Sequence, residues 1–159
     1  MAERVPRVGI GFDTHRWASE DRALWLAGVR FDGERGLDGH SDGDAVCHAI
    51  ADALLGAGAL GDVGEHFADD DPAFAGIAGA VLLARTLEIV RSGGFSARSC
   101  DVTVICDRPA IAPRRGDLRA RLAEVLELPL EAVSVKATRP EGLGLAGDGV
   151  GCMAVAVLL

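Results

Sequence analysis

Asp13 and His15 lie two residues apart in the strand-like run RVGIGFDTH, and His48 follows within the segment HSDGDAVCHAIADALLG. Side chains at positions i and i+2 of a strand point to the same face, so this carboxylate and this imidazole can converge on one point. A third ligand from a helix would complete a site of two histidines and one carboxylate. Such a site suits zinc and leaves one coordination position open for a substrate oxygen. The spacing therefore predicts a catalytic metal site.

Each of these three residues also has an ordinary explanation. Asp13 could cap a turn, His15 could lie on the surface, and His48 could be a hydrogen-bonded histidine of the core, because short motifs also match by chance. Taken together, the residues favour the metal site. The acidic segment 62–71 and Glu141 add oxygen ligands that a second, hard cation would need.

Asp44, His48 and Asp52 are spaced four residues apart and would share one face of a helix. A histidine that binds a metal commonly donates its other ring N–H to a carboxylate. We therefore expect Asp44 or Asp52 to orient His48. Ser41 or Asp42 is the expected N-cap of this helix.

The composition restricts the class of protein. A chain of 159 residues fits one domain, here residues 1–159. Only 4% of the residues are aromatic, so the core must consist of small aliphatic side chains packed closely. The formal net charge of -8 disfavours binding to nucleic acid or to an anionic membrane. A phosphorylated substrate remains compatible with this charge, because bound divalent ions can supply positive charge locally.

The cysteines indicate a reducing compartment. Cys47, Cys100, Cys106 and Cys152 lie in apolar runs without CxxC spacing, as reduced core residues of a cytosolic protein do. We find no signal-like start and no apolar run of ~20 residues that could span a bilayer. The expected location is therefore the cytoplasm.

The elements that must position these residues follow the order β-β-α-α-β-α-β-β, which predicts an α+β fold with helices packed on a single mixed sheet. The second strand is expected to form a hairpin with the first. The strands are expected at residues 7–12, 24–31, 101–106, 132–138 and 151–159, and the helices at 42–55, 77–92 and 116–126.

Four segments together resemble one family, the 2-C-methyl-D-erythritol 2,4-cyclodiphosphate synthases of the non-mevalonate isoprenoid pathway. They are GFDTH, GHSDGDAVCHAIADALLGAGALGDVGEHFADDDP, DVTVICDRP and VKATRPEGLGLAGDG. The resemblance implies a homotrimer of subunits with ferredoxin-like character and active sites between neighbouring subunits. It also implies conversion of 4-diphosphocytidyl-2-C-methyl-D-erythritol 2-phosphate into a cyclic diphosphate with release of CMP.

The resemblance implies roles for individual residues. Asp13, His15 and His48 would bind zinc, and Glu141 would bind a second divalent ion, magnesium or manganese. His40 and Arg139 would act in catalysis, segment 106–112 would line a cytidine pocket, and the region around 62–71 would hold methylerythritol. The residues implied in substrate binding are Asp13, Thr14, His15, His40, Ser41, Asp62, Val63, Gly64, Phe67, Asp69, Asp71, Cys106, Asp107, Arg108, Pro109, Ala110, Ile111, Ala112, Thr138, Arg139, Pro140, Glu141, Leu145 and Asp148.

The chain departs from the family pattern in its phosphate-binding loops. Ala110 stands where the family has a lysine, and Arg139 stands where it has a threonine. Because a guanidinium is a capable bidentate phosphate ligand, we expect Arg139 to compensate for the missing lysine. Asp148 and Val150 replace an arginine and a glutamate of the trimer's central channel, and Asp148 should repel an isoprenoid diphosphate there.

Two other functions fit the same residues. A zinc-dependent phosphoesterase would use water as the nucleophile instead of a substrate phosphate, and only cyclisation yields CMP together with a cyclic diphosphate. A divergent trimeric paralogue would bind nucleotide and metal with weak or altered activity. Zinc stoichiometry measured together with CMP release separates binding from catalysis.

Overall fold

The computed structural model describes residues 5–144 and 146–159. Its strands are β1 (Arg7–Arg16), β2 (Ala23–Leu26), β3 (Val29–Arg35), β4 (Ala97–Ile105), β5 (Val133–Thr138) and β6 (Gly149–Leu158). Its α-helices are α1 (Ala45–Gly58), α2 (Val63–His66), α3 (Gly79–Ser92) and α4 (Arg115–Leu126), and short 3₁₀ turns lie at Pro72–Phe74, Ala112–Arg114 and Leu130–Ala132.

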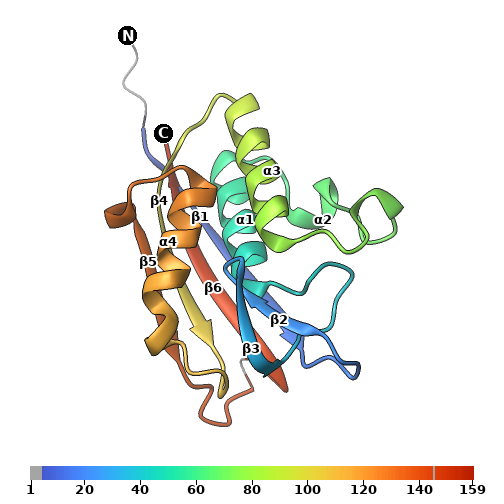
Figure 1. Cartoon of the computed structure of the whole chain (residues 1–159). Helices are drawn as coiled ribbons and strands as arrows, with labels where there is room; N and C mark the ends of the chain where they lie inside the picture. Colours follow the sequence, from blue (N-terminus) through green and yellow to red (C-terminus); the bar gives the residue numbers. More distant parts are fainter. Residues whose placement is uncertain (1–4, 145) are drawn as a thin grey trace.

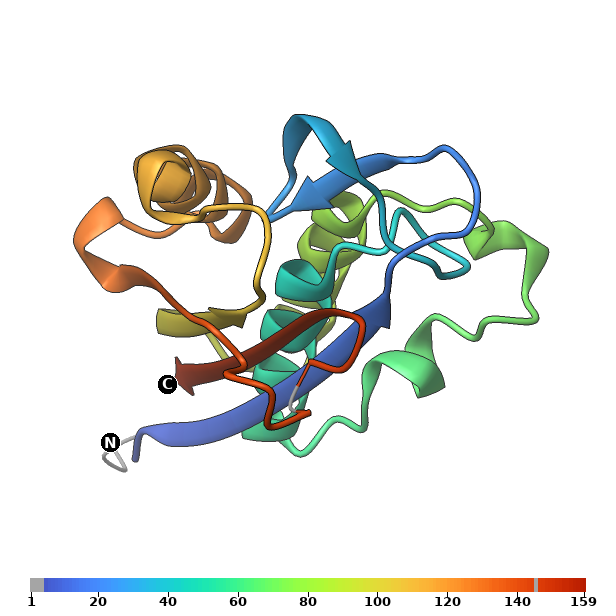
Figure 2. The same ribbon diagram turned by 90° about the horizontal axis from the view of Figure 1, so that it is seen from below.

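The main sheet is mixed and has the strand order β1-β6-β4-β5. β4 and β5 are parallel, and the other neighbours are antiparallel. α1 and α4 lie on one face of this sheet, and α3 packs against α1, as Figures 1 and 2 show. The α+β class and the mixed sheet with helices packed on it are thereby confirmed. No helix in the part of the chain described has the length and apolar character needed to cross a bilayer.

The prediction of one strand at 24–31, paired with the first strand, is wrong. The segment folds back on itself, and β2 and β3 form a separate antiparallel hairpin. Ala27 and Gly28 at its tip have φ values of 57° and 69°. Two consecutive positive φ angles are typical of the type I′ turn that joins hairpin strands tightly. Alanine rarely adopts this conformation, so Ala27 gave no sign of a turn and residues 24–31 were predicted as one continuous strand.

β1 and α1 approach each other very closely. β1 extends beyond its predicted end at Phe12 and therefore includes both Asp13 and His15. A Cβ added at Gly11 would lie 1.9 Å from the carbonyl oxygen of Ala49 on α1, so only glycine permits this approach. The close contact brings the side chains of α1 within reach of those on β1.

α1 begins after Asp44, not at the predicted caps Ser41 or Asp42. Asp44 is fully buried, and its Oδ1 accepts the N–H of Cys47 at 3.1 Å, which makes it the N-cap. Gly43, with a φ of 75°, keeps the preceding residues out of the helix. The Asp44 carboxylate also accepts both N–H groups of the β2–β3 turn, at 2.8 Å and 2.6 Å. One side chain thus joins the hairpin to the start of α1.

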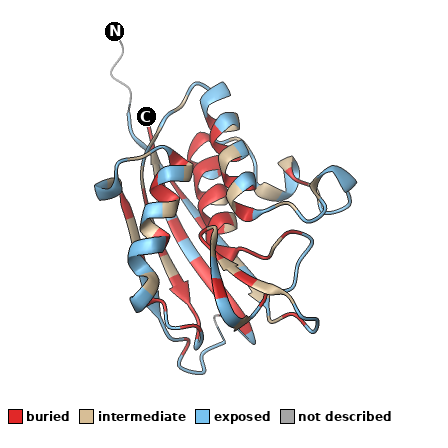
Figure 3. Ribbon diagram, viewed as in Figure 1, coloured by how far each residue is buried: buried red, intermediate tan, exposed pale blue. Residues whose placement is uncertain are grey.

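The core lies between the sheet and the helices, where buried residues face each other in Figure 3. It consists mainly of alanine, valine and leucine. All four cysteines are free and buried, as predicted. Burial raises the pKa of Cys106 to about 11 and that of Cys100 to about 12, so these thiols stay protonated.

The opposite face of the main sheet is apolar on β1 and β6, and none of the described helices covers it. Val8, Ile10 and Phe12 from β1 and Met153 and Val155 from β6 are exposed there, and Ile10 is 67% exposed. The register pairs Phe12 with Met153 and Ile10 with Val155, so these side chains adjoin. We call these five residues the apolar sheet face. A contiguous exposed apolar patch is typical of a protein interaction surface.

Candidate functional site

Asp13, His15 and His48 form a cluster whose ligand atoms all lie within 4.8 Å of one another. Oδ2 of Asp13 is 2.7 Å from Nδ1 of His15 and 3.6 Å from Nδ1 of His48. Although Oδ2 of Asp13 and Nδ1 of His15 lie close together, they are not aligned for a hydrogen bond. Both atoms are therefore buried without a hydrogen-bond partner. Buried polar atoms rarely go unsatisfied, and a metal ion would satisfy both of them. The residues therefore fit a metal ion, and their predicted convergence is confirmed.

The charges around this cluster shift the pKa of two of its members. Burial alone would raise the pKa of Asp13, but the close approach and the charges of the His15 and His48 rings outweigh it and lower the pKa to about 2. Burial alone would lower the pKa of His48, but Asp13, Asp44 and Asp42 outweigh it and raise the pKa. The metal-free centre thus combines an ionised carboxylate with a histidine that holds its proton to a higher pH than usual.

Zinc binding to the metal-free protein is expected to weaken on acidification, beginning near neutral pH. Zinc must displace the proton from His48, and the raised pKa of this histidine extends the competition to higher pH. Asp13 stays ionised in this range because its pKa is about 2. Chelator-competition titrations between about pH 8 and about pH 6 should show the affinity falling as protons bind. An affinity independent of pH over this range would contradict the expectation.

Ser41, not Asp44 or Asp52, contacts the second nitrogen of His48. Its Oγ lies 3.2 Å from Nε2 of His48. The predicted carboxylates are engaged by backbone groups instead: Asp44 caps α1, and Asp52 accepts the N–H of Val63 at 2.8 Å. Ser41 therefore orients this imidazole.

A cavity of about 440 Å³ opens beside the metal cluster. The loop 39–41 forms one wall, and the segment from Asp62 onward forms another. Nδ1 of His40 lies 3.7 Å from Oδ2 of Asp69, so these two walls approach each other at one side. The cavity is lined by Asp13, His15, Gly39, His40, Ser41, His48, Asp52, Asp62, Val63, Gly64, Phe67, Ala68, Asp69, Phe74, Ile77 and Leu82.

Thr14 and Asp71 were predicted for substrate binding near the metal cluster, but neither lines this cavity. Thr14 is exposed and lies between Asp13 and His15 in β1, so its side chain points to the other face of the strand. Asp71 accepts the N–H of Ala73 at 2.9 Å and caps a 3₁₀ turn. Leu145 lies outside the described residues.

A second cavity, of about 360 Å³, lies where the parallel strands β4 and β5 end. It brings most of the predicted cytidine segment together with Thr138 and Arg139. The N–H of Cys106 donates to the carbonyl of Thr138 at 3.2 Å, which joins the two segments. The cavity is lined by Cys106, Asp107, Pro109, Ala110, Ile111, Ala112, Arg115, Ala137, Thr138 and Arg139.

One chain does not assemble all of the predicted site. None of the residues that the structure describes lines both cavities, and neither Pro140 nor Glu141 lines either of them. Glu141 is exposed and lies outside the metal cluster. Arg108 and Asp148 line a third cavity, of about 430 Å³, where Arg108 pairs with Glu34 at 3.2 Å. The metal-binding half and the nucleotide-binding half of the predicted site are therefore separate in the single subunit.

The sequence matches the model of one protein family over residues 6–159, which is nearly the whole chain. The chain belongs to the YgbB family. This membership confirms the family resemblance inferred from the sequence.

Relatives and solved structures agree with the YgbB assignment. The 2-C-methyl-D-erythritol 2,4-cyclodiphosphate synthase of Porphyromonas gingivalis is 46% identical over 155 residues, which cover 96% of this chain and 95% of that protein. A solved 2C-methyl-D-erythritol-2,4-cyclodiphosphate synthase has a TM-score of 0.88 and 37% identity, and the match covers 96% of this chain and 100% of that one. A synthase structure in its CDP-bound form has a TM-score of 0.83 and 35% identity, over 96% of this chain and 99% of that one.

Sequence reasoning missed the apolar wall of the first cavity in this YgbB chain. Phe74 and Ile77 follow the acidic run 69–71 at a short distance, and only this proximity could have indicated a role. Arg115 at the second cavity opens α4 and carried no such signal. The missed lining residues are Gly39, Phe74, Ile77, Leu82, Arg115 and Ala137.

Proposed function

We propose that Asp13, His15 and His48 bind zinc and that the adjoining cavity holds the methylerythritol phosphate part of the substrate. The chain has the function of its family: it converts 4-diphosphocytidyl-2-C-methyl-D-erythritol 2-phosphate into 2-C-methyl-D-erythritol 2,4-cyclodiphosphate and releases CMP. The single observation that carries the site assignment is the three-ligand cluster beside a cavity of about 440 Å³.

The reaction needs positioning more than covalent help from the protein. An oxygen of the 2-phosphate attacks the β phosphorus, the bond from that phosphorus to the α-phosphate oxygen breaks, and CMP leaves. Zinc, together with a magnesium or manganese ion bound by Glu141, would neutralise the phosphate charges when bound. His40, exposed beside the cavity, would donate a hydrogen bond to the reacting phosphates. Asp62 uses Oδ1 to cap the N–H of Glu65 at 2.9 Å, and its other oxygen would accept a substrate hydroxyl.

The second cavity is proposed to bind the cytidine ring. Its lining segment follows a buried strand and offers backbone groups that can read the edge of a base. Arg139, in the same cavity, would bind the diphosphate beside the ring. CDP in the bound form of a related synthase supports a cytidine site in this chain.

A homotrimer with shared active sites is proposed as the working form. Three observations support it: the apolar sheet face, the separation of the two cavities, and the position of Glu141 outside the metal cluster. A neighbouring subunit would cover the apolar sheet face and complete each site. We also propose that the enzyme works in the cytoplasm, which the free, buried cysteines support.

Product analysis tests the proposed reaction. The purified protein, loaded with zinc and magnesium, is incubated with the cytidine-diphosphate-linked substrate, and products are followed by phosphorus NMR. CMP and a cyclic diphosphate should appear together in equal amounts. CMP with an uncyclised phosphate product would identify a phosphoesterase, and stoichiometric zinc without CMP release would identify a binding protein.

Arg139→Ala is expected to raise KM or lower kcat by roughly tenfold, because the variant loses a bidentate phosphate ligand. Ala110, in the same cavity, cannot replace that contact. Arg139→Lys keeps the charge and should lose less activity than the alanine variant. Unchanged kcat and KM in Arg139→Ala would show that this guanidinium does not contact the phosphates.

A further inference from the structure

We propose that Arg22 is a positioning residue, which clamps the loop 39–41 and thereby aligns His40 and the two histidines of the metal cluster. The proposal rests on the proposed function for what the aligned residues do. The positioning role itself is supported by hydrogen bonds within this chain.

The guanidinium of Arg22 donates to two carbonyl oxygens of one short loop. Nη1 donates to the carbonyl of Gly39 at 2.9 Å, and Nη2 donates to the carbonyl of Ser41. His40 is the residue between them. Because a guanidinium holds its N–H groups in a rigid planar fork, the two bonds fix the carbonyls relative to each other. The fork thus holds the peptide units on both sides of His40.

Each end of the clamped loop contacts a histidine of the metal cluster. Gly39 lies against the ring of His15, since a Cβ added at Gly39 would be only 3.1 Å from Cδ2 of that ring. Oγ of Ser41 lies 3.2 Å from Nε2 of His48. A shift of this loop would therefore change the contacts of both imidazoles as well as the place of His40.

The clamp is anchored at both ends. The backbone carbonyl of Arg22 accepts the N–H of Gly36 at 3.0 Å, and a Cβ at Gly36 would lie 2.6 Å from that oxygen. On the other side of the loop, the carbonyl of His40 accepts the N–H of Gly76 at 2.8 Å. The loop is therefore held between two segments that lie far apart in the sequence.

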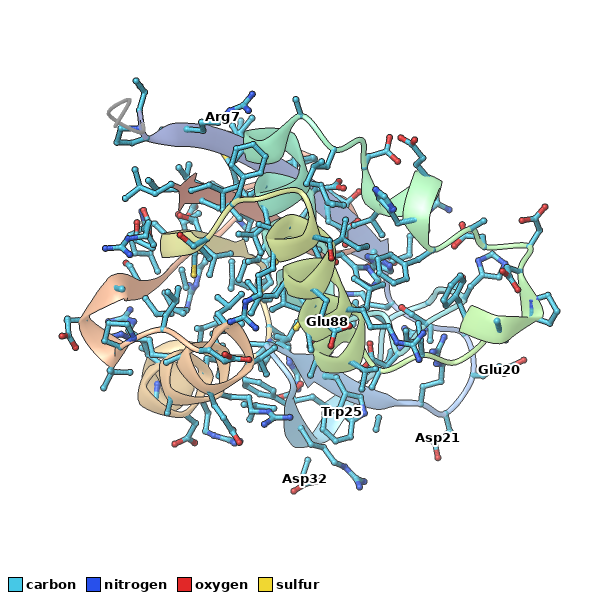
Figure 4. The ribbon with its side chains drawn as sticks, turned by 90° about the horizontal axis from the view of Figure 1, so that it is seen from above. Arg7, Glu20, Asp21, Trp25, Asp32 and Glu88 are labelled. Carbon is cyan, nitrogen blue, oxygen red and sulfur yellow. The ribbon has the colours of Figure 1, made fainter. Side chains whose placement is uncertain are left out.

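Within the described part of the chain, Arg22 forms no salt bridge. Its guanidinium is half-buried, and no carboxylate in residues 5–144 and 146–159 pairs with it. The acids that precede it, Glu20 and Asp21, point outward in Figure 4. The two loop carbonyls are thus its acceptors, which is the arrangement expected of a clamp.

Arg22→Lys is the decisive variant, because it keeps the charge but loses the planar fork. We expect kcat to fall by roughly 10- to 100-fold, since small displacements of reacting groups are costly. Amide hydrogen exchange across residues 38–43 should become faster, and the absorption spectrum of the protein loaded with cobalt in place of zinc should shift. Arg30→Lys is the matched control: Arg30 lies on β3 of the hairpin that Arg22 directly precedes, and it pairs with Asp32 on the surface, so all three measurements should stay at wild-type values.

Wild-type kcat in Arg22→Lys would overturn the proposal, whether or not exchange changes, because the charge alone would then suffice. Loss of the thermal unfolding transition in this variant would also overturn it, since Arg22 would then be required for folding. Failure of the proposed function is distinguishable: the zinc-loaded wild-type protein would release no CMP. In that case, amide hydrogen exchange and the cobalt spectrum of Arg22→Lys would still show whether Arg22 holds the loop 39–41 in place.

Discussion

Replacing His48 with alanine is expected to remove zinc from the protein and to lower CMP release by more than about a hundredfold. Loss of residues that merely orient a metal ligand already costs roughly 10- to 100-fold, and His48 is one of only three proposed protein ligands. The variant would leave Oδ2 of Asp13 and Nδ1 of His15 buried beside a void. Mass spectrometry checks the loss of zinc, and an assay of CMP release checks the loss of activity.

His66→Ala is the matched control for this experiment. His66 lies on α2 and contacts the carbonyl of Leu60 at 2.6 Å, outside the metal cluster. Its removal should leave the zinc content unchanged. If the His48 variant keeps a full equivalent of zinc, the proposed ligand set is wrong, and if it loses zinc but keeps its activity, the ion has no part in the reaction.

Ile10→Asp is expected to convert the protein into folded monomers without CMP release. Ile10 lies at the centre of the apolar sheet face, and an uncompensated carboxylate there would cost several kcal/mol once the proposed trimer buries it. The monomer would retain its metal cluster, because Ile10 points away from α1. Activity would be lost because the two cavities lie apart in one subunit, and in the proposed trimer a neighbouring subunit joins them.

Val81→Asp provides the comparison. Val81 is also an exposed apolar residue, at 46%, but it lies on α3 and not on the sheet face. Size-exclusion chromatography with light scattering should show wild-type assembly for this variant and a monomer for Ile10→Asp, with similar circular dichroism for both. A monomeric Ile10→Asp variant with full activity would show that one subunit contains a complete site.

The metal centre could be predicted from the sequence because it depends on one simple periodicity and one residue type. The alternation of β1 places Asp13 and His15 on one face, and the chemistry of His48 supplies a third ligand. The role of Asp44 was predicted wrongly because its hydrogen-bond donor was assigned from helix spacing alone. Its actual partners include the N–H groups of the β2–β3 turn, which no local pattern relates to α1. The clamp by Arg22 was missed for the same reason, since it joins segments that only the tertiary fold brings together.

The β2–β3 hairpin contacts both halves of the proposed site in one subunit. Its turn donates hydrogen bonds to Asp44 at the start of α1. On β3, Glu34 pairs with Arg108. The ring of Phe31, also on β3, lies beneath the guanidinium of Arg114, with 5.1 Å between Cζ and the ring centroid. In the proposed trimer these two halves serve different catalytic centres. The hairpin would then link one centre to the next through these contacts, and the three hairpins of the trimer would connect the three centres in a closed ring.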